Sequence, residues 1–255
     1  MIFWKQKMYN EFSKIYDTLM SDVDYEKWVE YILQIFDKYG QNLKEISKVL
    51  DVACGTGNIS LPLSKLGYIV YGVDISDNML AIAENKARRS NQNITFKRQD
   101  MRNLKLSSRF DFINSSCDGI NYIIKEKELL ETFLGFHKLL NKNGLLIFDI
   151  SSYFKLRFIL GNNTIFEEKN NICYCWENSF DNRNSIIKMK LNFFIPQGNL
   201  YHRFEETHIQ KAYKKKEIVE LLKKSGFTIL DCYGDFTFEP PNEWCERIFF
   251  VAIKD

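Results

Sequence analysis

Short apolar runs alternate with longer amphipathic stretches along the first 150 residues. Polar or turn residues bound each run, and the stretches between the runs repeat their apolar positions with the period of a helix. This alternation is typical of a parallel sheet that helices cover on both faces. The predicted strands are 49–52, 68–73, 94–96, 110–113 and 145–148, and the predicted helices between them are 58–66, 77–90 and 126–140.

Two helices are predicted ahead of the first strand, within residues 8–39. Tyr9, Phe12 and Tyr16 recur at helical spacing, and a second apolar stripe begins at Trp28. The polar segment 21–24 breaks the pattern between the two stripes and supplies capping residues.

The pattern changes after Asp149. Residues 165–210 contain strand-like segments separated by turn residues, which predicts an antiparallel insert. One helix and two strands follow, and they return the chain to the first sheet. The insert strands are 172–176, 186–194 and 200–210, and the final elements are 216–225, 227–233 and 247–253.

The elements together predict an α/β fold. Its sheet has seven mostly parallel strands flanked by helices, with an antiparallel β insert after the fifth strand. We expect residues 1–150 to form the N-terminal helices and the binding core, 151–212 to form the insert, and 213–255 to return to the core.

A glycine-rich turn carries the most chemical information. The predicted strand 49–52 runs into Gly55-Thr56-Gly57 and then into a helix, so a ligand can approach the backbone closely. No Gly-Lys-Ser/Thr follows, as a nucleoside triphosphate loop needs, and Ser60 stands where a dinucleotide motif has its third glycine. Asp51 fits a third ligand, S-adenosylmethionine (SAM), whose ammonium needs an acceptor beside the turn.

Two further acids follow the next two predicted strands. Asp74 can accept both hydroxyls of a ribose. Asp100 can accept the amino group of adenine while Met101 donates its backbone N–H. Met79 lies one helical turn past Asp74 and can cover the purine face. Because the carboxyl ends of parallel strands meet at one edge of a sheet, these groups predict one adenosyl site.

These motifs resemble those of class I SAM-dependent methyltransferases. Residues 50–57 are similar to the family's glycine-rich motif, 73–76 to its ribose motif, 99–101 to its adenine motif and 143–149 to its fifth strand. The resemblance implies a Rossmann-like fold, SAM as the cofactor and S-adenosylhomocysteine (SAH) as the product. It assigns cofactor contacts to Tyr16, Trp28, Asp51, Ala53, Gly55, Gly57, Asp74, Ile75, Met79, Gln99, Asp100, Met101, Ser116 and Cys117. Ala53 departs from the pattern, since most members have glycine there.

Segments outside the core resemble a bacterial subgroup that contains dTDP-aminosugar N-methyltransferases and clostridial relatives. The similar segments include 118–122, 174–178 and 206–208. The resemblance implies that the insert caps the active site and supports a homodimer, and that the N-terminal helix closes over SAM. Tyr16 would then face the cofactor carboxylate, with Trp28 beside it.

Strand parity predicts the candidate bases. His202, Phe204, Glu206 and His208 share one face of the predicted strand 200–210. If that face lines the site, Glu206 or His208 can accept a proton from the acceptor. The alternative is that both are solvated strand residues.

Three residues after the fourth strand lie nearest the expected methyl position. Asp118 and Tyr122 are further catalytic candidates, and Asn121 and Tyr122 are candidate substrate contacts. Trp176 is a candidate substrate contact from the insert. The insert's aromatic residues can shield a sulfonium by cation–π contact; they are Tyr174, Trp176, Phe194 and Tyr201.

Charge and cysteine content narrow the partners. A net charge of +2 disfavours a nucleic-acid partner. No secretory leader precedes the six cysteines, which predicts a cytoplasmic protein with reduced thiols. Cys173 and Cys175 lack a second pair at metal-ligand spacing, so no metal site is expected. No apolar run is long enough to cross a membrane.

Three functions fit these features. The first is methyl transfer to a nitrogen or oxygen of a small-molecule acceptor. The second is methylation of RNA, DNA or protein, although residues 114–117 lack the Asn/Asp-Pro-Pro-Tyr/Phe motif of the base-amino and glutamine enzymes. The third is a SAM-binding module without catalytic activity.

Overall fold

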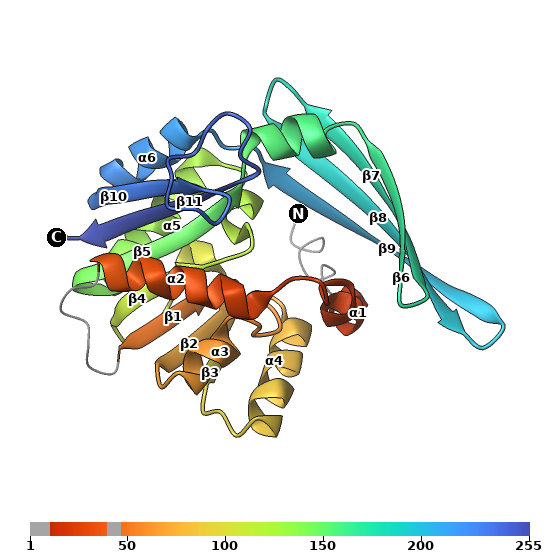
Figure 1. Cartoon of the computed structure of the whole chain (residues 1–255), viewed down its shortest axis with the longest axis horizontal. Coiled ribbons are helices and arrows are strands. Elements are labelled where there is room, and N and C mark those ends of the chain that lie inside the picture. The colour runs from red at the N-terminus through yellow and green to blue at the C-terminus, as the bar shows by residue number, and fades with distance from the viewer. Residues whose placement is uncertain (1–10, 40–46) are drawn as a thin grey trace.

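A seven-stranded sheet forms the centre of the computed structural model, which describes residues 11–39 and 47–255 (Figure 1). The strand order is β3-β2-β1-β4-β5-β11-β10, where β1 to β5 run parallel and β11 is antiparallel to both of its neighbours. This confirms the predicted fold. The strands are β1 (Lys48–Val52), β2 (Ile69–Asp74), β3 (Thr95–Arg98), β4 (Phe110–Ser115), β5 (Leu140–Ser151), β10 (Phe227–Gly234) and β11 (Arg247–Lys254).

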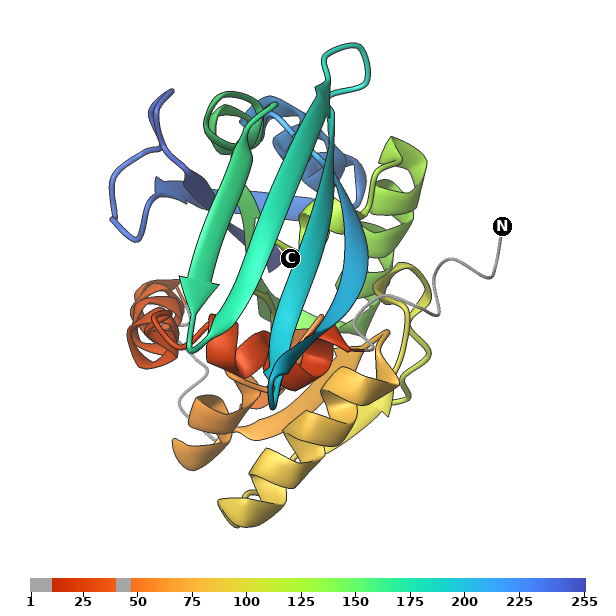
Figure 2. The same cartoon turned by 90° about the vertical axis from the view of Figure 1, so that its right-hand side faces the viewer.

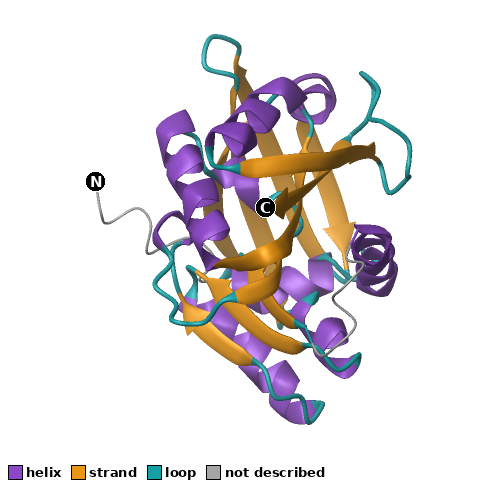
Figure 3. Ribbon diagram, turned by 90° about the vertical axis from the view of Figure 1, so that its left-hand side faces the viewer, coloured by secondary structure: helices purple, strands orange, loops and turns teal. Residues whose placement is uncertain are grey.

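Helices cover both faces of this sheet because its strands are apolar on both sides (Figure 3). Successive residues Val49 and Leu50 of β1 belong to two different apolar clusters, as strand parity requires. The Leu50 cluster contains side chains of α5 (Glu126–Leu139) and α6 (Lys215–Lys224). The Val49 cluster contains side chains of α2 (Tyr25–Tyr39) and α3 (Ser60–Lys65). One further helix, α4 (Asp77–Arg89), contacts β2 and β3.

A second sheet, antiparallel and four-stranded, lies over one side of the core (Figure 2). It is formed by the predicted insert, and we call it the cap sheet. The pattern missed its first strand, in which intermediate and exposed residues show no clean alternation. It also missed a π-helix, η3 (Lys155–Leu160), that joins β5 to the cap sheet. The cap strands are β6 (Thr164–Lys169), β7 (Ile172–Asp181), β8 (Ile186–Gln197) and β9 (Leu200–Lys211).

A third apolar cluster joins the cap sheet to the first helix, α1 (Phe12–Leu19). Phe12, Ile15 and Leu19 of α1 pack with side chains of β8 that include Leu191 and Phe193. The predicted contribution of Tyr9 to this helix lies outside the described residues. No helix among residues 11–39 and 47–255 has the length and apolar character needed to cross a membrane.

Candidate active site

The glycine-rich turn between β1 and α3 has left-handed backbone at alternate residues. Ala53, Gly55 and Gly57 have φ angles of 57°, 54° and 79°. A Cβ on Gly57 would lie 3.2 Å from the Cβ of Ala83 in α4, so this glycine lets the turn pack on that helix. A Cβ on Gly55 would meet no atom within 4 Å, so this glycine leaves open space above the turn.

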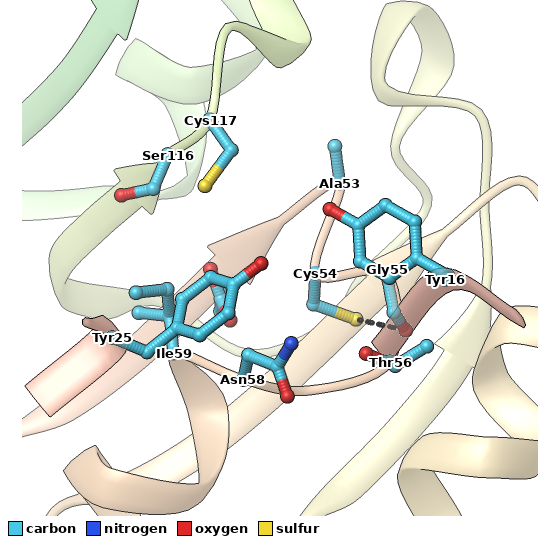
Figure 4. Close-up of a pocket in the computed structure, with 11 residues that line it drawn as sticks. Tyr16, Tyr25, Ala53, Cys54, Gly55, Thr56, Asn58, Ile59, Ser116 and Cys117 are labelled. Atoms are coloured by element: carbon cyan, nitrogen blue, oxygen red, sulfur yellow. Dashed lines mark hydrogen bonds between the residues drawn. The ribbon is translucent and has the colours of Figure 1, made fainter. Parts of the chain in front are cut away.

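A pocket lies above this turn, lined by Tyr16 of α1, Tyr25 of α2 and the residues that follow β4 (Figure 4). It brings together several predicted cofactor residues from separate parts of the chain. Two tyrosines face it, and burial raises the pKa of Tyr25 to about 12 and that of Tyr16 well above its usual value. The lining residues are Tyr16, Tyr25, Asp51, Ala53, Cys54, Gly55, Thr56, Asn58, Ile59, Ser116 and Cys117.

Asp51 lies at the base of the pocket and is 1% exposed. Its carboxylate accepts hydrogen bonds from Ser60 Oγ at 2.5 Å and from Asn114 Nδ2 at 2.8 Å. Burial raises the pKa of Asp51 to about 6, against the opposing effect of these two hydrogen bonds. A cation in the pocket would favour the ionised form, so this carboxylate suits the ammonium of an amino-acid moiety.

Asp74 binds the turn itself. Its Oδ2 accepts from the backbone N–H of Gly55 at 2.9 Å, and its Oδ1 accepts from the N–H of Ser76 at 2.8 Å. Burial raises its pKa, and the two N–H donors oppose that shift. Each carboxylate oxygen keeps accepting capacity for a further donor, such as a ribose hydroxyl.

The third predicted acid is engaged elsewhere. Asp100 caps the short helix η1 (Met101–Asn103) and forms an ion pair with Arg102, which also pairs with Glu128 at 3.0 Å. Asp100 does not line the pocket above the turn, and neither do its neighbours in the predicted adenine motif, Gln99 and Met101.

The remaining members of the predicted adenosyl set have other surroundings. Gln99 Oε1 accepts from the N–H of Lys105 at 3.0 Å. Met101 packs against the Leu50 cluster. Met79 is 2% exposed and packs in the cluster under α1, whereas Ile75 is 38% exposed beside Asp74.

The loop after β4 is fixed by a buried ion-pair network that the sequence did not reveal. Asp149, fully buried at the end of β5, accepts from the backbone N–H groups of Cys117 at 2.8 Å and Asp118 at 3.0 Å. Both loop residues have left-handed φ angles, 60° and 53°. Arg247 of β11 pairs with Asp149 and, at 3.2 Å, with Asp118. These charges raise the pKa of Arg247 despite its burial, so it stays a cation.

The same network reaches the cap sheet and Trp28. Asp118 Oδ2 accepts from Gln210 Nε2 of β9 at 2.8 Å. The Arg247 guanidinium lies 4.8 Å from the ring centroid of Trp28. Trp28 therefore packs on this cation rather than lining the pocket, and its Nε1 is a buried donor with no partner among the described residues.

Asn121, a predicted substrate contact, is fully buried and bound to backbone. Its Nδ2 donates to the carbonyl groups of Ser151 at 3.0 Å and Lys211 at 2.9 Å, and its Oδ1 accepts from the Ser151 N–H at 3.0 Å. Those two residues end β5 and β9, where the chain enters and leaves the cap. Asn121 thus joins the cap's two ends, and both of its amide protons are already donated.

The candidate bases come together beneath the cap. Tyr122 Oη lies 3.1 Å from His208 Nδ1, and His208 Nε2 lies 3.6 Å from Glu206 Oε2. Glu206 is 6% and His208 4% exposed, which contradicts the alternative that they are solvated. Phe12 of α1 lies against the His208 ring, with centroids 5.8 Å apart. Burial lowers the pKa of His208 to about 4, so the imidazole is neutral at pH 7.

Strand register divides the aromatic residues of the cap. Trp176 pairs with Leu191, which pairs with Glu206, so these three share the inner face. Tyr174 pairs with Phe193 on that face as well. The expectation that Phe194 and Tyr201 shield the site is wrong. Phe194 follows Phe193 and therefore points to the opposite face, and Tyr201 is 61% exposed near the free end of the cap.

The residues around the turn fit the SAM predicted from the sequence. Gly55 leaves the space above the turn free, and a buried carboxylate with a raised pKa lies below that space. Tyr25, Thr56 and Asn58 also line the pocket but escaped sequence analysis. Position 25 precedes an ordinary helical stripe. Thr56 lies between the two glycines and Asn58 between the second glycine and α3, in a turn where side-chain direction follows no pattern.

Comparisons with known proteins identify the kind of domain. Residues 49–144 match the family model of a methyltransferase domain. A relative in Geobacillus sp. (strain WCH70), named as a methyltransferase, is 36% identical over 247 residues and covers 96% of this chain and 99% of its own.

Solved structures extend the likeness to the whole chain. A SAM-dependent methyltransferase from Clostridium acetobutylicum ATCC 824 has a TM-score of 0.88 and 36% identity, covering 96% of this chain and 98% of its own. The sugar N-methyltransferase KedS8 from Streptoalloteichus sp. ATCC 53650 shares the fold, with a TM-score of 0.76, 18% identity and coverage of 98% and 93%. The chain belongs to the SAM-dependent methyltransferase family.

Proposed function

We propose that this methyltransferase acts on a nitrogen or oxygen atom of a small-molecule acceptor that binds beneath the cap sheet. The observation that carries the proposal is the buried group of Tyr122, His208 and Glu206. These side chains come from the core and from the cap, and Phe12 packs against the His208 ring. Because Glu206 and His208 are almost fully buried, an acceptor that reaches them would have to be small enough to be surrounded, which disfavours a polymer.

The chain's own residues supply positioning and proton transfer. When bound, SAM supplies an electrophilic methyl group for in-line displacement. His208 is neutral at pH 7, which is the form that a proton acceptor needs, and we propose that it takes the proton that the acceptor loses. Glu206, 3.6 Å from His208 Nε2, would stabilise the imidazolium that results. The Asp149–Arg247 network fixes the loop that lines the cofactor pocket and leads to Tyr122.

The cap sheet and the core have different roles in this proposal. We propose that residues 1–150 and 213–255 bind the cofactor and that residues 151–212 enclose the acceptor. Inner-face aromatic residues of the cap, Tyr174 and Trp176, would exclude water from the reacting atoms.

A transfer assay tests the proposal. The protein is incubated with methyl-labelled SAM and three sets of acceptors: small amines and alcohols, bacterial RNA, and bacterial protein. Label in the first set alone supports the proposal. Label in RNA or protein alone would replace it with the second candidate function. Tight SAM binding with no transfer to any set would identify a non-catalytic module.

A further inference from the structure

Helix α1 contacts both halves of the site. Phe12 packs on the cap, 5.1 Å from Phe193 between ring centroids, and it also covers His208. Tyr16 lines the cofactor pocket. At the end of the helix, the Leu19 carbonyl accepts a hydrogen bond from Lys169 Nζ of β6 at 2.7 Å. These contacts make α1 part of the cap side of the molecule.

One carboxylate binds this helix to the cofactor side. Asp17 Oδ1 accepts from Thr56 Oγ1 at 2.6 Å and from Asn58 Nδ2 at 3.0 Å. Asp17 Oδ2 accepts from Lys86 Nζ of α4 at 3.0 Å. Lys86 also donates to the side-chain oxygen of Asn58. We call these four residues the Asp17 cluster.

The Asp17 cluster contacts the glycine-rich turn directly. Thr56 lies between the two glycines and Asn58 follows the second, and both line the cofactor pocket. Tyr16, adjacent to Asp17, lies on the Gly55 side of that pocket, opposite Ser116 and Cys117 (Figure 4). Breaking the Asp17 contacts would therefore release the wall of the pocket that Tyr16 forms.

We propose that Asp17 is a positioning residue that closes α1 over the cofactor pocket, so that cofactor exchange requires the Asp17 cluster to open. Since the same helix carries Phe12 against His208, opening for exchange also uncovers the candidate base. Closure of the cofactor pocket and enclosure of the acceptor are then a single event.

SAH dissociation tests this proposal without any acceptor, so the result is independent of the proposed function. Bound SAH is chased with excess SAM, and its release rate is measured by stopped flow. Asp17→Asn removes the charge from these hydrogen bonds, and we expect dissociation to be about tenfold faster. Lys86→Met removes one donor, and we expect a rise of about threefold because the ion pair is partly exposed. Lys14→Met is the matched control, since Lys14 is an exposed residue of the same helix that forms an ion pair with Glu11, and its release rate should be unchanged.

Amide hydrogen exchange supplies a second measurement that a purely structural role would not reproduce. In SAH-loaded Asp17→Asn, amides of residues 12–19 should exchange faster while those of α2 keep their parental rates. Release rates within twofold of the parent for both Asp17→Asn and Lys86→Met, with unchanged exchange in α1, would overturn the proposal. Faster exchange spread evenly over both helices would also overturn it, because that result indicates general destabilisation. If Asp17→Asn does not fold, Lys86→Met decides on both measurements.

Discussion

The seven-stranded sheet and the cap sheet build their parts of the site by different means. In the first sheet, Asp51, Asp74 and Asp149 are each bound by at least two N–H or O–H donors, several of them backbone. In the cap, His208 lies among aromatic rings, and burial lowers its pKa. The first arrangement fixes geometry through the backbone, and the second sets protonation through exclusion of water. Loss of a hydrogen bond around the glycine-rich turn should therefore weaken cofactor binding. Loss of the basic nitrogen of His208 in the cap should instead slow turnover.

The largest expected effect is on turnover. His208→Gln keeps the size and polarity of the side chain but removes its basic nitrogen, and we expect turnover to fall about 100-fold or more. SAH affinity should stay at the parental value, because His208 does not line the cofactor pocket. His202→Gln, at an exposed position on the same strand, is the control. Parental turnover in His208→Gln would remove this residue from the catalytic set.

A smaller effect is expected on cofactor affinity. Asp74→Ala removes the acceptor that binds the N–H groups of Gly55 and Ser76, so SAH should bind about 10- to 150-fold more weakly by calorimetry. Asp77→Ala is the control, because the Asp77 side chain forms a solvent-exposed ion pair with Arg98. Equal dissociation constants for the two variants would contradict the assignment of Asp74.

The pH dependence of SAH binding examines Asp51. Its pKa is raised to about 6 by burial, and the ligand's ammonium favours the ionised carboxylate. Affinity should therefore be nearly constant between pH 7 and 7.5 and fall as the pH drops through 6, by about tenfold between pH 7.5 and 5. Asp51→Asn should abolish this dependence. Adenosine, which lacks the amino-acid moiety, should show none with the parent protein, and a matching dependence for adenosine would assign the titration to another group.

The smallest effect concerns Ala53. A left-handed φ of 57° is unfavourable for alanine, so Ala53→Gly relieves about 1 kcal/mol of strain, partly offset by the greater freedom of glycine in the unfolded chain. We expect a gain of about 0.5 kcal/mol in the free energy of unfolding. Ala81→Gly on the exposed side of helix α4 should instead cost about 1 kcal/mol. A loss in both variants would show that the methyl group of Ala53 contributes packing, in agreement with its closeness to Gly119.

Sequence patterns predicted the core well because burial on both faces leaves a strong signal. The apolar runs of β1, β4 and β5 are local features that can be recognised in the sequence. Their alternation with helical stretches predicts a parallel sheet. Parity along β9 also predicted that Glu206 and His208 share a face, and the structure buries both. Helix α1 covers only part of this face of β9. The sequence could not show where that cover ends, and His202 is exposed to solvent.

Tertiary contacts account for what the sequence missed. In the sequence, Arg247 is the polar first residue of a strand and Asp149 lies at the end of another. The antiparallel pairing of β5 and β11 brings them together as an ion pair. Asp100 forms an ion pair with Arg102, only two residues away, but no sequence pattern predicts this pairing. Asn121 lies in a segment for which we predicted ligand contact. Its hydrogen bonds to the two ends of the cap depend on the fold and could not be predicted from the sequence.

The contacts of Asn121 bear on how this family can diversify. All three involve backbone atoms of Ser151 and Lys211, so the identity of the side chains at those two positions is irrelevant to them. A different stretch of polypeptide, of another length and sequence, can therefore be joined at the same two points while one asparagine keeps its ends together. If the segment between these points encloses the acceptor, as we propose, exchanging it would change acceptor specificity and leave the cofactor-binding residues of the core unchanged.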